Sequence, residues 1–183
     1  MEDILEKIKR FADGAHGTQL RKYTPERYIV HPIRVMEICK QYTQEHTVLG
    51  AALLHDVLED TPTTKDQLYD FLRTLLDEKQ AAKTVALVVE LSDVYVKSDY
   101  PQLNRKQRKA KEAERIQLTS AEAQTIKYAD IIDNCKEIVK YDRQFAPIFL
   151  RECLHLLTIM ERGNPVLRKI ALDQLINELK RLT

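Results

Sequence analysis

The sequence is organised around Ala51-Ala52-Leu53-Leu54-His55-Asp56-Val57-Leu58-Glu59-Asp60-Thr61, a run of small and apolar residues that carries four metal-binding or proton-handling side chains. We predict a helix from about Thr47 to Asp60, in which His55 lies one turn before Glu59 and Asp56 one turn before Asp60. Burial of an unpaired carboxylate costs free energy, and a divalent cation is one of the few partners that removes this cost. The segment therefore predicts a metal site. The simpler alternative is a helix whose last turn becomes polar at the protein surface.

The composition is typical of a helical globular protein. Of the 183 residues, 44% are apolar and 31% are charged, with only four Gly and six Pro. We therefore predict an all-α fold of about eight to ten helices, formed as a single domain over residues 1–183. No apolar run is long enough to span a membrane, and the acidic N-terminus is unlike a signal peptide, so we expect a cytoplasmic protein that does not bind membranes. The net charge of +1 gives no general attraction to nucleic acid, which we do not expect as a partner.

Helix start and stop signals divide the rest of the chain. We expect a first helix that ends near Gly14–Gly17, a helix start at Val30-His31-Pro32-Ile33, capping boxes at Thr64–Gln67 and Thr119–Glu122, a helix over 81–91, a helix up to about Lys140, a core helix capped by Gly163, and a last helix after Pro165. The segment 104–111 is a basic helix start, and two interpretations stay open. It either faces phosphate groups through Arg105 and Arg108, or is a solvated surface helix balanced by Glu112 and Glu114.

Two histidines and two aspartates from three predicted helical segments form the one convergent set of metal-binding type: His31, His55, Asp56 and Asp130. A mixed imidazole and carboxylate set suits Mn²⁺, Fe²⁺ or Zn²⁺. The three cysteines are far apart in apolar segments, so we expect buried free thiols and no structural zinc site. Four protein ligands leave an octahedral ion with open positions for water and substrate, which indicates catalysis.

Four blocks of the sequence, read in order, resemble the HD superfamily of metal-dependent phosphohydrolases, and within it the hydrolase domain of RelA/SpoT-type alarmone enzymes. The length is similar to that of stand-alone small alarmone hydrolases. The blocks span residues 16–134 and consist of His16-x-x-Gln19-x-Arg21-Lys22, Tyr28-Ile29-Val30-His31-Pro32, Ala51–Thr61, and Lys127-Tyr128-Ala129-Asp130-x-x-x-Asn134. The remaining helices, over 147–182, are expected to pack on this motif core.

The resemblance implies hydrolysis of the 3′-pyrophosphate of a guanosine polyphosphate, usually with Mn²⁺. The convergent set would hold the metal. Glu59 and Asp60 would be the catalytic acidic pair that orients or deprotonates the attacking water. Arg21 would stack on the base, with Lys22 beside it, and Asn134 would contact the nucleotide. A planar guanidinium on a loop suits the stacking role.

Three departures from the family pattern leave the substrate open. The loop Tyr23–Arg27 is longer than the family's usual glycine-containing turn. Glu90-Leu91-Ser92-Asp93 stands where the family has a stretch like Glu-Gly-Val-Thr-Lys. Ile131 follows Asp130 where the family usually has Arg or Lys. The alternative substrates are an adenosine alarmone, NADPH if the enzyme is a 2′-phosphatase, and a nucleoside monophosphate if it is a 5′-phosphatase. A non-catalytic nucleotide sensor or partner-binding domain is the third possibility. Because no room remains for a synthetase domain after the last helix, we expect hydrolysis only.

Overall fold

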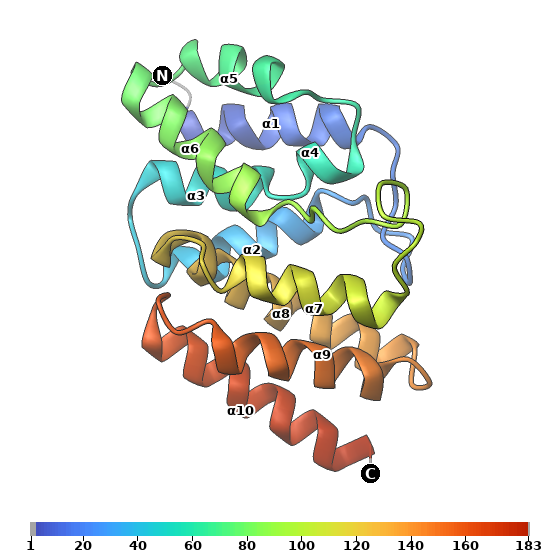
Figure 1. Cartoon of the computed structure of the whole chain (residues 1–183). Helices are drawn as coiled ribbons and strands as arrows, with labels where there is room; N and C mark the ends of the chain where they lie inside the picture. The colour runs from blue at the N-terminus through green and yellow to red at the C-terminus, as the bar shows by residue number, and fades with distance from the viewer. Residues whose placement is uncertain (1–2, 183) are drawn as a thin grey trace. The chain divides into compact units, whose positions relative to one another are not determined.

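The computed structural model describes residues 3–182, and these form ten α-helices without a β-sheet (Figure 1). The prediction of an all-α fold is confirmed. Across the described residues, no helix is both long enough and apolar enough to cross a membrane. The chain divides into two compact units, with the boundary between Ser92 and Asp93. The prediction of a single domain over 1–183 stays a prediction.

The first unit is built around a helix that is buried on every side. Its helices are α1 (Ile4–His16), α2 (Val30–Lys40), α3 (His46–Leu54), α4 (Val57–Asp60), α5 (Lys65–Arg73) and α6 (Glu78–Leu91). All residues from Thr47 to Leu54 in α3 are buried, and α3 packs against α1, α2 and α6. A helix that is apolar all round is expected in a protein core. Gly50 allows the close approach of α1, because a Cβ atom there would lie 3.0 Å from Cδ1 of Ile8.

The helix boundaries of this unit follow the local signals. Helix α1 ends where Gly17 adopts a φ of 57° and its N–H group binds the carbonyl of Asp13, a conformation that glycine takes without a steric penalty. Helix α5 begins with the predicted capping box between Thr64 and Gln67. The stacked rings of Phe11 and Phe71, with centroids 4.0 Å apart, hold α1 and α5 side by side (Figure 1).

The predicted continuous helix from Thr47 to Asp60 is wrong at its centre. Helix α3 ends at Leu54, His55 and Asp56 form a turn, and the four-residue α4 begins at Val57. Nδ1 of His55 donates to the carbonyl of Ala52 at 2.9 Å, which is the acceptor that an uninterrupted helix offers to the N–H of Asp56. The side chain thus competes with the helical ladder. Both turn residues keep backbone angles of the right-handed helical region, and the N–H of Asp60 binds the carbonyl of Asp56 at 2.9 Å. The predicted one-turn offset from Asp56 to Asp60 is therefore kept.

The second unit contains α7 (Arg105–Ile116), α8 (Ala121–Tyr141), α9 (Ala146–Ile159) and α10 (Pro165–Leu182). Helix α10 packs along both α8 and α9, and α8 also packs on α9 (Figure 1). The three cysteines of the chain are buried thiols that form no disulfide, as predicted.

Two predicted helix ends in this unit are wrong. The cap of α8 is Ser120, whose hydroxyl accepts from the N–H of Ala123, whereas the hydroxyl of Thr119 donates to the carbonyl of Ile116 at 2.7 Å. Gly163 does not cap α9, which ends at Ile159 with Met160 as its C-cap residue. Glycine is needed at 163 because a Cβ atom there would lie 2.5 Å from Cε2 of Tyr128.

Candidate functional site

Three of the four predicted metal ligands meet in the first unit. One ligand atom from each of His31, His55 and Asp56 lies within 4.8 Å of the others. Oδ2 of Asp56 is 3.1 Å from Nε2 of His55 and 3.6 Å from Nε2 of His31. The two imidazole rings meet edge to face, with centroids 5.1 Å apart. This arrangement of donors can surround a single ion.

Both histidines are buried, and a backbone carbonyl holds the ring of His55. His31 is the second residue of α2 and is 1% exposed, and His55 is 3% exposed. Because a carbonyl oxygen only accepts, the bond from Nδ1 of His55 to Ala52 places a proton on Nδ1, so Nε2 is the nitrogen that can bind an ion. Nε2 is also the atom that faces Asp56. The donor set therefore fits a divalent ion of the Mn²⁺, Fe²⁺ or Zn²⁺ type.

Tyr28 contacts this cluster directly. Its hydroxyl donates to Oδ2 of Asp56 at 2.7 Å. Burial raises the pKa of Tyr28 above its ordinary value, and the negative charges of Asp56 and Asp60 raise it further. The phenol is therefore protonated and acts as a hydrogen-bond donor at neutral pH.

Glu59 and Asp60, the predicted acidic pair, lie on the short helix α4 that directly follows the His-Asp turn. The side chains of both residues are exposed. The backbone N–H groups of both bind the carbonyl of Asp56, at 3.2 and 2.9 Å. Because Asp60 acts electrostatically on Tyr28, its carboxylate lies near the hydroxyl that binds Asp56. The acidic pair is thus carried at the rim of the cluster.

The two predicted basic substrate contacts lie on the loop between α1 and α2. The guanidinium of Arg21 lies over the ring of Tyr28, 5.4 Å from its centroid. Nζ of Lys22 donates to the hydroxyl of Tyr23 at 2.8 Å and is exposed. An isolated antiparallel β-bridge between Leu20 and Arg27 joins the two sides of the loop.

Ion pairs join this loop to both of the helices that flank it. Arg27 pairs with Asp13 of α1 at 2.8 Å and donates to the carbonyl of Gly17 at 2.9 Å. Arg34 of α2 donates to both carboxylate oxygens of Glu26, at 2.9 and 2.8 Å. Arg21 is therefore presented from a loop with a defined conformation.

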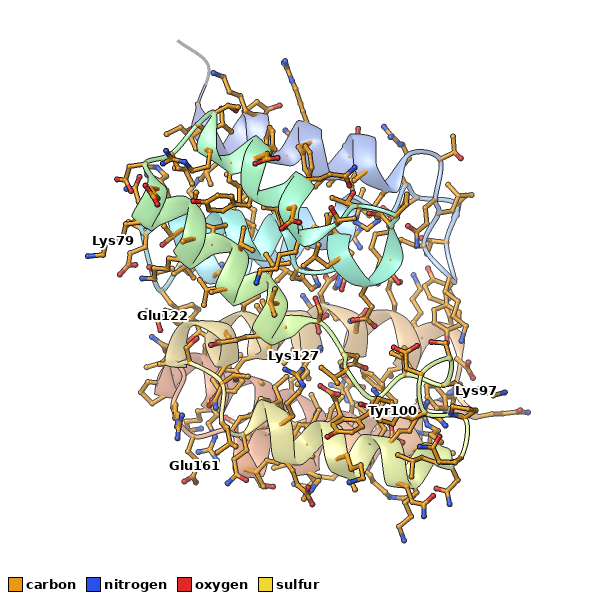
Figure 2. All side chains as sticks on the ribbon, turned by 45° about the horizontal axis from the view of Figure 1, so that its top comes forward. Lys79, Lys97, Tyr100, Glu122, Lys127 and Glu161 are labelled. Atoms are coloured by element: carbon orange, nitrogen blue, oxygen red, sulfur yellow. The ribbon has the colours of Figure 1, made fainter. Side chains whose placement is uncertain are left out.

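The fourth predicted ligand, Asp130, lies on α8 in the second unit and is 5% exposed. Its Oδ1 accepts from Nδ2 of Asn134 at 2.6 Å, and its Oδ2 lies 2.8 Å from Nζ of Lys127, which is labelled in Figure 2. These two contacts confirm that residues three and four positions apart share one face of α8. A buried carboxylate is thereby neutralised within its own helix.

The basic segment 104–111 forms the start of α7, as predicted, and two of its basic residues form ion pairs. Arg105 binds both carboxylate oxygens of Glu152, at 3.1 and 2.7 Å, and its guanidinium lies over the ring of Phe145. Lys109 binds Asp93 at 3.0 Å. The partners of these two residues are not the acidic residues that we expected from the sequence. These contacts favour the surface-helix interpretation for Arg105.

Asp93 illustrates how charge organises the loop before α7, which also carries Lys97 and Tyr100 (Figure 2). Burial alone raises the pKa of Asp93, but the positive charges of Lys127 and Lys109 outweigh this effect, so the pKa lies below its ordinary value. Asp93 is therefore ionised at neutral pH and holds the start of the loop against α7.

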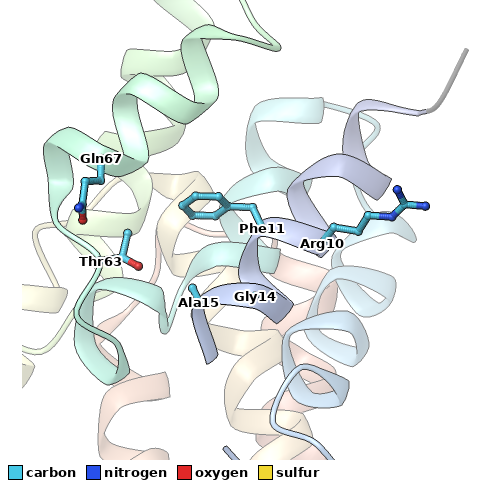
Figure 3. Close-up of a pocket in the computed structure, with 6 residues that line it drawn as sticks. All are labelled: Arg10, Phe11, Gly14, Ala15, Thr63 and Gln67. Atoms are coloured by element: carbon cyan, nitrogen blue, oxygen red, sulfur yellow. The ribbon is translucent and has the colours of Figure 1, made fainter. Parts of the chain in front are cut away.

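A hollow in the first unit is lined by none of the predicted metal ligands. It is lined by residues of α1 and of the segment before and at the start of α5: Arg10, Phe11, Gly14, Ala15, Thr63 and Gln67 (Figure 3). Phe11 points into the space between these segments, while Arg10 points away from it (Figure 3). The lining includes no histidine or carboxylate, so it offers no metal chemistry.

The sequence analysis missed the role of Tyr28, although it noted the segment that begins with this residue. A tyrosine three residues before His31 carried no signal by itself. Only the structure shows that its hydroxyl reaches Asp56, which is 28 positions away.

Comparison with known proteins agrees with this site. The family model described as "HD domain" matches residues 28–135, which include every predicted metal ligand and the acidic pair. The chain is 29% identical over 179 residues to a guanosine-3′,5′-bis(diphosphate) 3′-pyrophosphohydrolase of Aquifex aeolicus, a match that covers 96% of this chain and 23% of that protein. A protein of the same name from Spiroplasma citri is 32% identical over 157 residues, covering 83% of this chain and 19% of that protein. The chain thus spans less than a quarter of the length of these relatives.

A solved structure has the same fold. A metazoan orthologue of SpoT, described as hydrolysing ppGpp, aligns with a TM-score of 0.79 at 22% identity, covering 100% of this chain and 98% of that one. The matched family model covers more than half of the chain and contains the His-Asp pair in its turn between α3 and α4. The chain therefore belongs to the HD domain family.

Proposed function

We propose that this chain is a metal-dependent hydrolase that removes the 3′-pyrophosphate from guanosine polyphosphates of the ppGpp and pppGpp type, yielding GDP or GTP and pyrophosphate. The observation that carries the proposal is the cluster of His31, His55 and Asp56, with ligand atoms within 4.8 Å of one another. The names of the Aquifex and Spiroplasma relatives support the substrate class.

In this proposal His31, His55 and Asp56 hold the ion, and Asp130 supplies the fourth protein ligand. Mn²⁺ is the ion that we propose, because the resemblance to RelA/SpoT-type hydrolase domains implies it; the mixed imidazole and carboxylate set suits Mn²⁺ as well as Fe²⁺ or Zn²⁺. When bound, such an ion lowers the pKa of a water molecule and polarises a phosphoryl oxygen. The match to the HD domain model supports this assignment, because it spans residues 28–135 and so includes Asp130.

Glu59 and Asp60 have a different role in this proposal. They directly follow the His-Asp turn, and their carboxylates are exposed, as proton acceptors at a substrate site must be. Further carboxylates on the ion would raise the pKa of its water, which makes them poorly suited as ligands. We assign to them the orientation of the attacking water and the removal of its proton, a contribution of about 10²–10⁴-fold to the rate.

Three further residues would contact the nucleotide. Arg21 would stack on the base, and its position over the Tyr28 ring supports this role, because a planar guanidinium stacks well on flat rings. Lys22 beside it would meet a phosphate. Asn134 would contact the nucleotide, and its bond to Asp130 supports a position beside that carboxylate.

A substrate panel tests the proposal. The purified chain is incubated with Mn²⁺ and, separately, ppGpp, pppGpp, ppApp, NADPH and nucleoside monophosphates, and the products are separated by charge. We expect pyrophosphate to be released from the guanosine 3′-pyrophosphates. Phosphate release from NADPH or from monophosphates alone would replace the proposed substrate with one of the alternatives. The cytoplasmic location and the absence of a nucleic-acid partner remain predictions.

A further inference from the structure

Tyr28 contacts several parts of the candidate site. Its ring stacks on His16, with centroids 4.5 Å apart and planes inclined by 25°. Arg21 lies over its ring at 5.4 Å. Its hydroxyl donates to Oδ2 of Asp56 at 2.7 Å. One side chain therefore contacts both the loop that carries the predicted base contact and a predicted metal ligand.

The ring of Tyr28 has little freedom to move. Nδ1 of His16, on which the ring stacks, donates to Oε1 of Gln19 at 2.9 Å. The backbone N–H of Tyr28 binds the carbonyl of the same Gln19, also at 2.9 Å. Gln19 thus fixes both the stacking partner and the backbone of Tyr28. A side chain held in this way can position the group to which it donates.

Asp56 lies among the other predicted ligands. Its Oδ2 lies 3.1 Å from Nε2 of His55 and 3.6 Å from Nε2 of His31. The hydroxyl of Tyr28 donates to this same oxygen at 2.7 Å. This hydrogen bond restricts rotation of the carboxylate and keeps Oδ2 directed at the two imidazoles.

We propose that Tyr28 is a positioning residue that orients the Asp56 carboxylate for the divalent ion before the ion arrives. The proposal rests on the proposed function, since it takes the cluster of His31, His55 and Asp56 as the metal site. Groups that hydrogen-bond to metal ligands typically change metal affinity by about 10–100-fold when they are removed. We expect a loss of this size for Tyr28→Phe, which removes the hydroxyl and keeps the stacked ring.

The test measures metal binding directly, without nucleotide. The full chain is stripped of metal and titrated with Mn²⁺. Binding is followed by calorimetry or by the electron paramagnetic resonance signal of the free ion. Thr84→Val is the matched control, because Thr84 is a fully buried residue of the same unit whose hydroxyl donates to Gln80 within α6 at 2.9 Å. We expect the Mn²⁺ Kd to rise about 10–100-fold in Tyr28→Phe and to stay within about two-fold of wild type in Thr84→Val.

A second measurement separates positioning from catalysis. Tyr28→Phe should need a higher Mn²⁺ concentration for half-maximal turnover, but its kcat at saturating Mn²⁺ should return to within a few-fold of wild type. If the metal-free variant is partly unfolded, the Mn²⁺ dependence of refolding, followed by circular dichroism, reports the same Kd.

The outcomes distinguish this proposal from the proposed function. Equal Mn²⁺ affinity in wild type and Tyr28→Phe would overturn the positioning role, and the substrate assignment would stand. A weaker Mn²⁺ affinity in the variant would support positioning even if the wild type hydrolysed another nucleotide. If the wild type bound no divalent ion, both the positioning role and the metal-dependent mechanism would be wrong.

Discussion

Gly163→Ala should destabilise the second unit strongly. An added Cβ atom would lie 2.5 Å from Cε2 of Tyr128, 2.9 Å from its Cζ and 2.9 Å from the backbone nitrogen of Thr125. Ordinary contact begins at 3.4 Å, so the ring must yield by roughly 1 Å. The ring cannot swing away without loss, because its hydroxyl donates to the carbonyl of Met160 at 2.6 Å.

The expected magnitude follows from these contacts. Overpacking in a close-packed interior costs about 1–3 kcal/mol, and weakening of the buried hydrogen bond adds to it. We expect the free energy of unfolding to fall by about 2–3 kcal/mol, with the Tm lower by about 4–12 °C for a chain of this size. Thermal and urea unfolding followed by circular dichroism measure both quantities.

Gly14→Ala is the matched control. Gly14 lies inside α1, and a Cβ atom there meets nothing within 4 Å. Alanine is favoured over glycine in a helix by about 0.5–1 kcal/mol, so this variant should be more stable than wild type. The same substitution should therefore have opposite signs at the two positions.

The packing argument would be refuted if Gly163→Ala unfolded within about 0.5 kcal/mol of wild type. Equal destabilisation by both substitutions would contradict it as well, because the argument depends on the difference in space around the two glycines.

Three further predictions concern the site and its surroundings. Glu59→Gln and Asp60→Asn should each keep stoichiometric metal, measured by calorimetry, while kcat falls by about two or more decades in steady-state kinetics. Turnover within a few-fold of wild type in both variants would show that neither residue removes a proton. Arg21→Ala should lower kcat/KM with a nearly unchanged Tm, because the residue lies on a polar loop, and normal kinetics with a large loss of stability would assign it to the fold. Asp93→Asn should lower stability near pH 7 by about 1 kcal/mol. The pKa of the Asp93 carboxyl lies below its ordinary value of 3.8 in the folded chain, so the difference in free energy of unfolding between wild type and variant should shrink as the pH falls below 3.8. Urea unfolding at several pH values measures this difference, and a difference that stays constant with pH would contradict the ion pair.

Much of the fold was predictable because its signals are local. The capping box at Thr64, the glycine that ends α1 and the proline in the first turn of α2 act within a few residues of their own positions. The apolar periodicity indicated the helices because burial of one face is what stabilises them. These predictions needed no knowledge of distant contacts.

The wrong predictions involve competition between partners. The helix through His55 breaks where the imidazole takes a backbone carbonyl, and the sequence alone does not show which acceptor wins. Gly163 resembles a helix cap, but it is required by the ring of Tyr128, 35 positions earlier.

The candidate site was predictable only where residue type alone identifies a ligand. His31, His55 and Asp56 could be identified by residue type, and the structure brings them together. The hydroxyl of Tyr28 and the pairing of Arg105 with Glu152 depend on contacts between segments 28 and 47 positions apart, for which the sequence holds no local signal.

The central claim is that this chain hydrolyses a guanosine 3′-pyrophosphate with a divalent ion held by His31, His55 and Asp56. The most direct measurement is pyrophosphate release from ppGpp by the metal-free chain, by the chain reloaded with Mn²⁺, and by Asp56→Ala under the same conditions. We expect turnover only in the reloaded wild type, with loss of both metal and activity in the variant. Full turnover in excess chelator, or normal turnover by Asp56→Ala, would contradict the account.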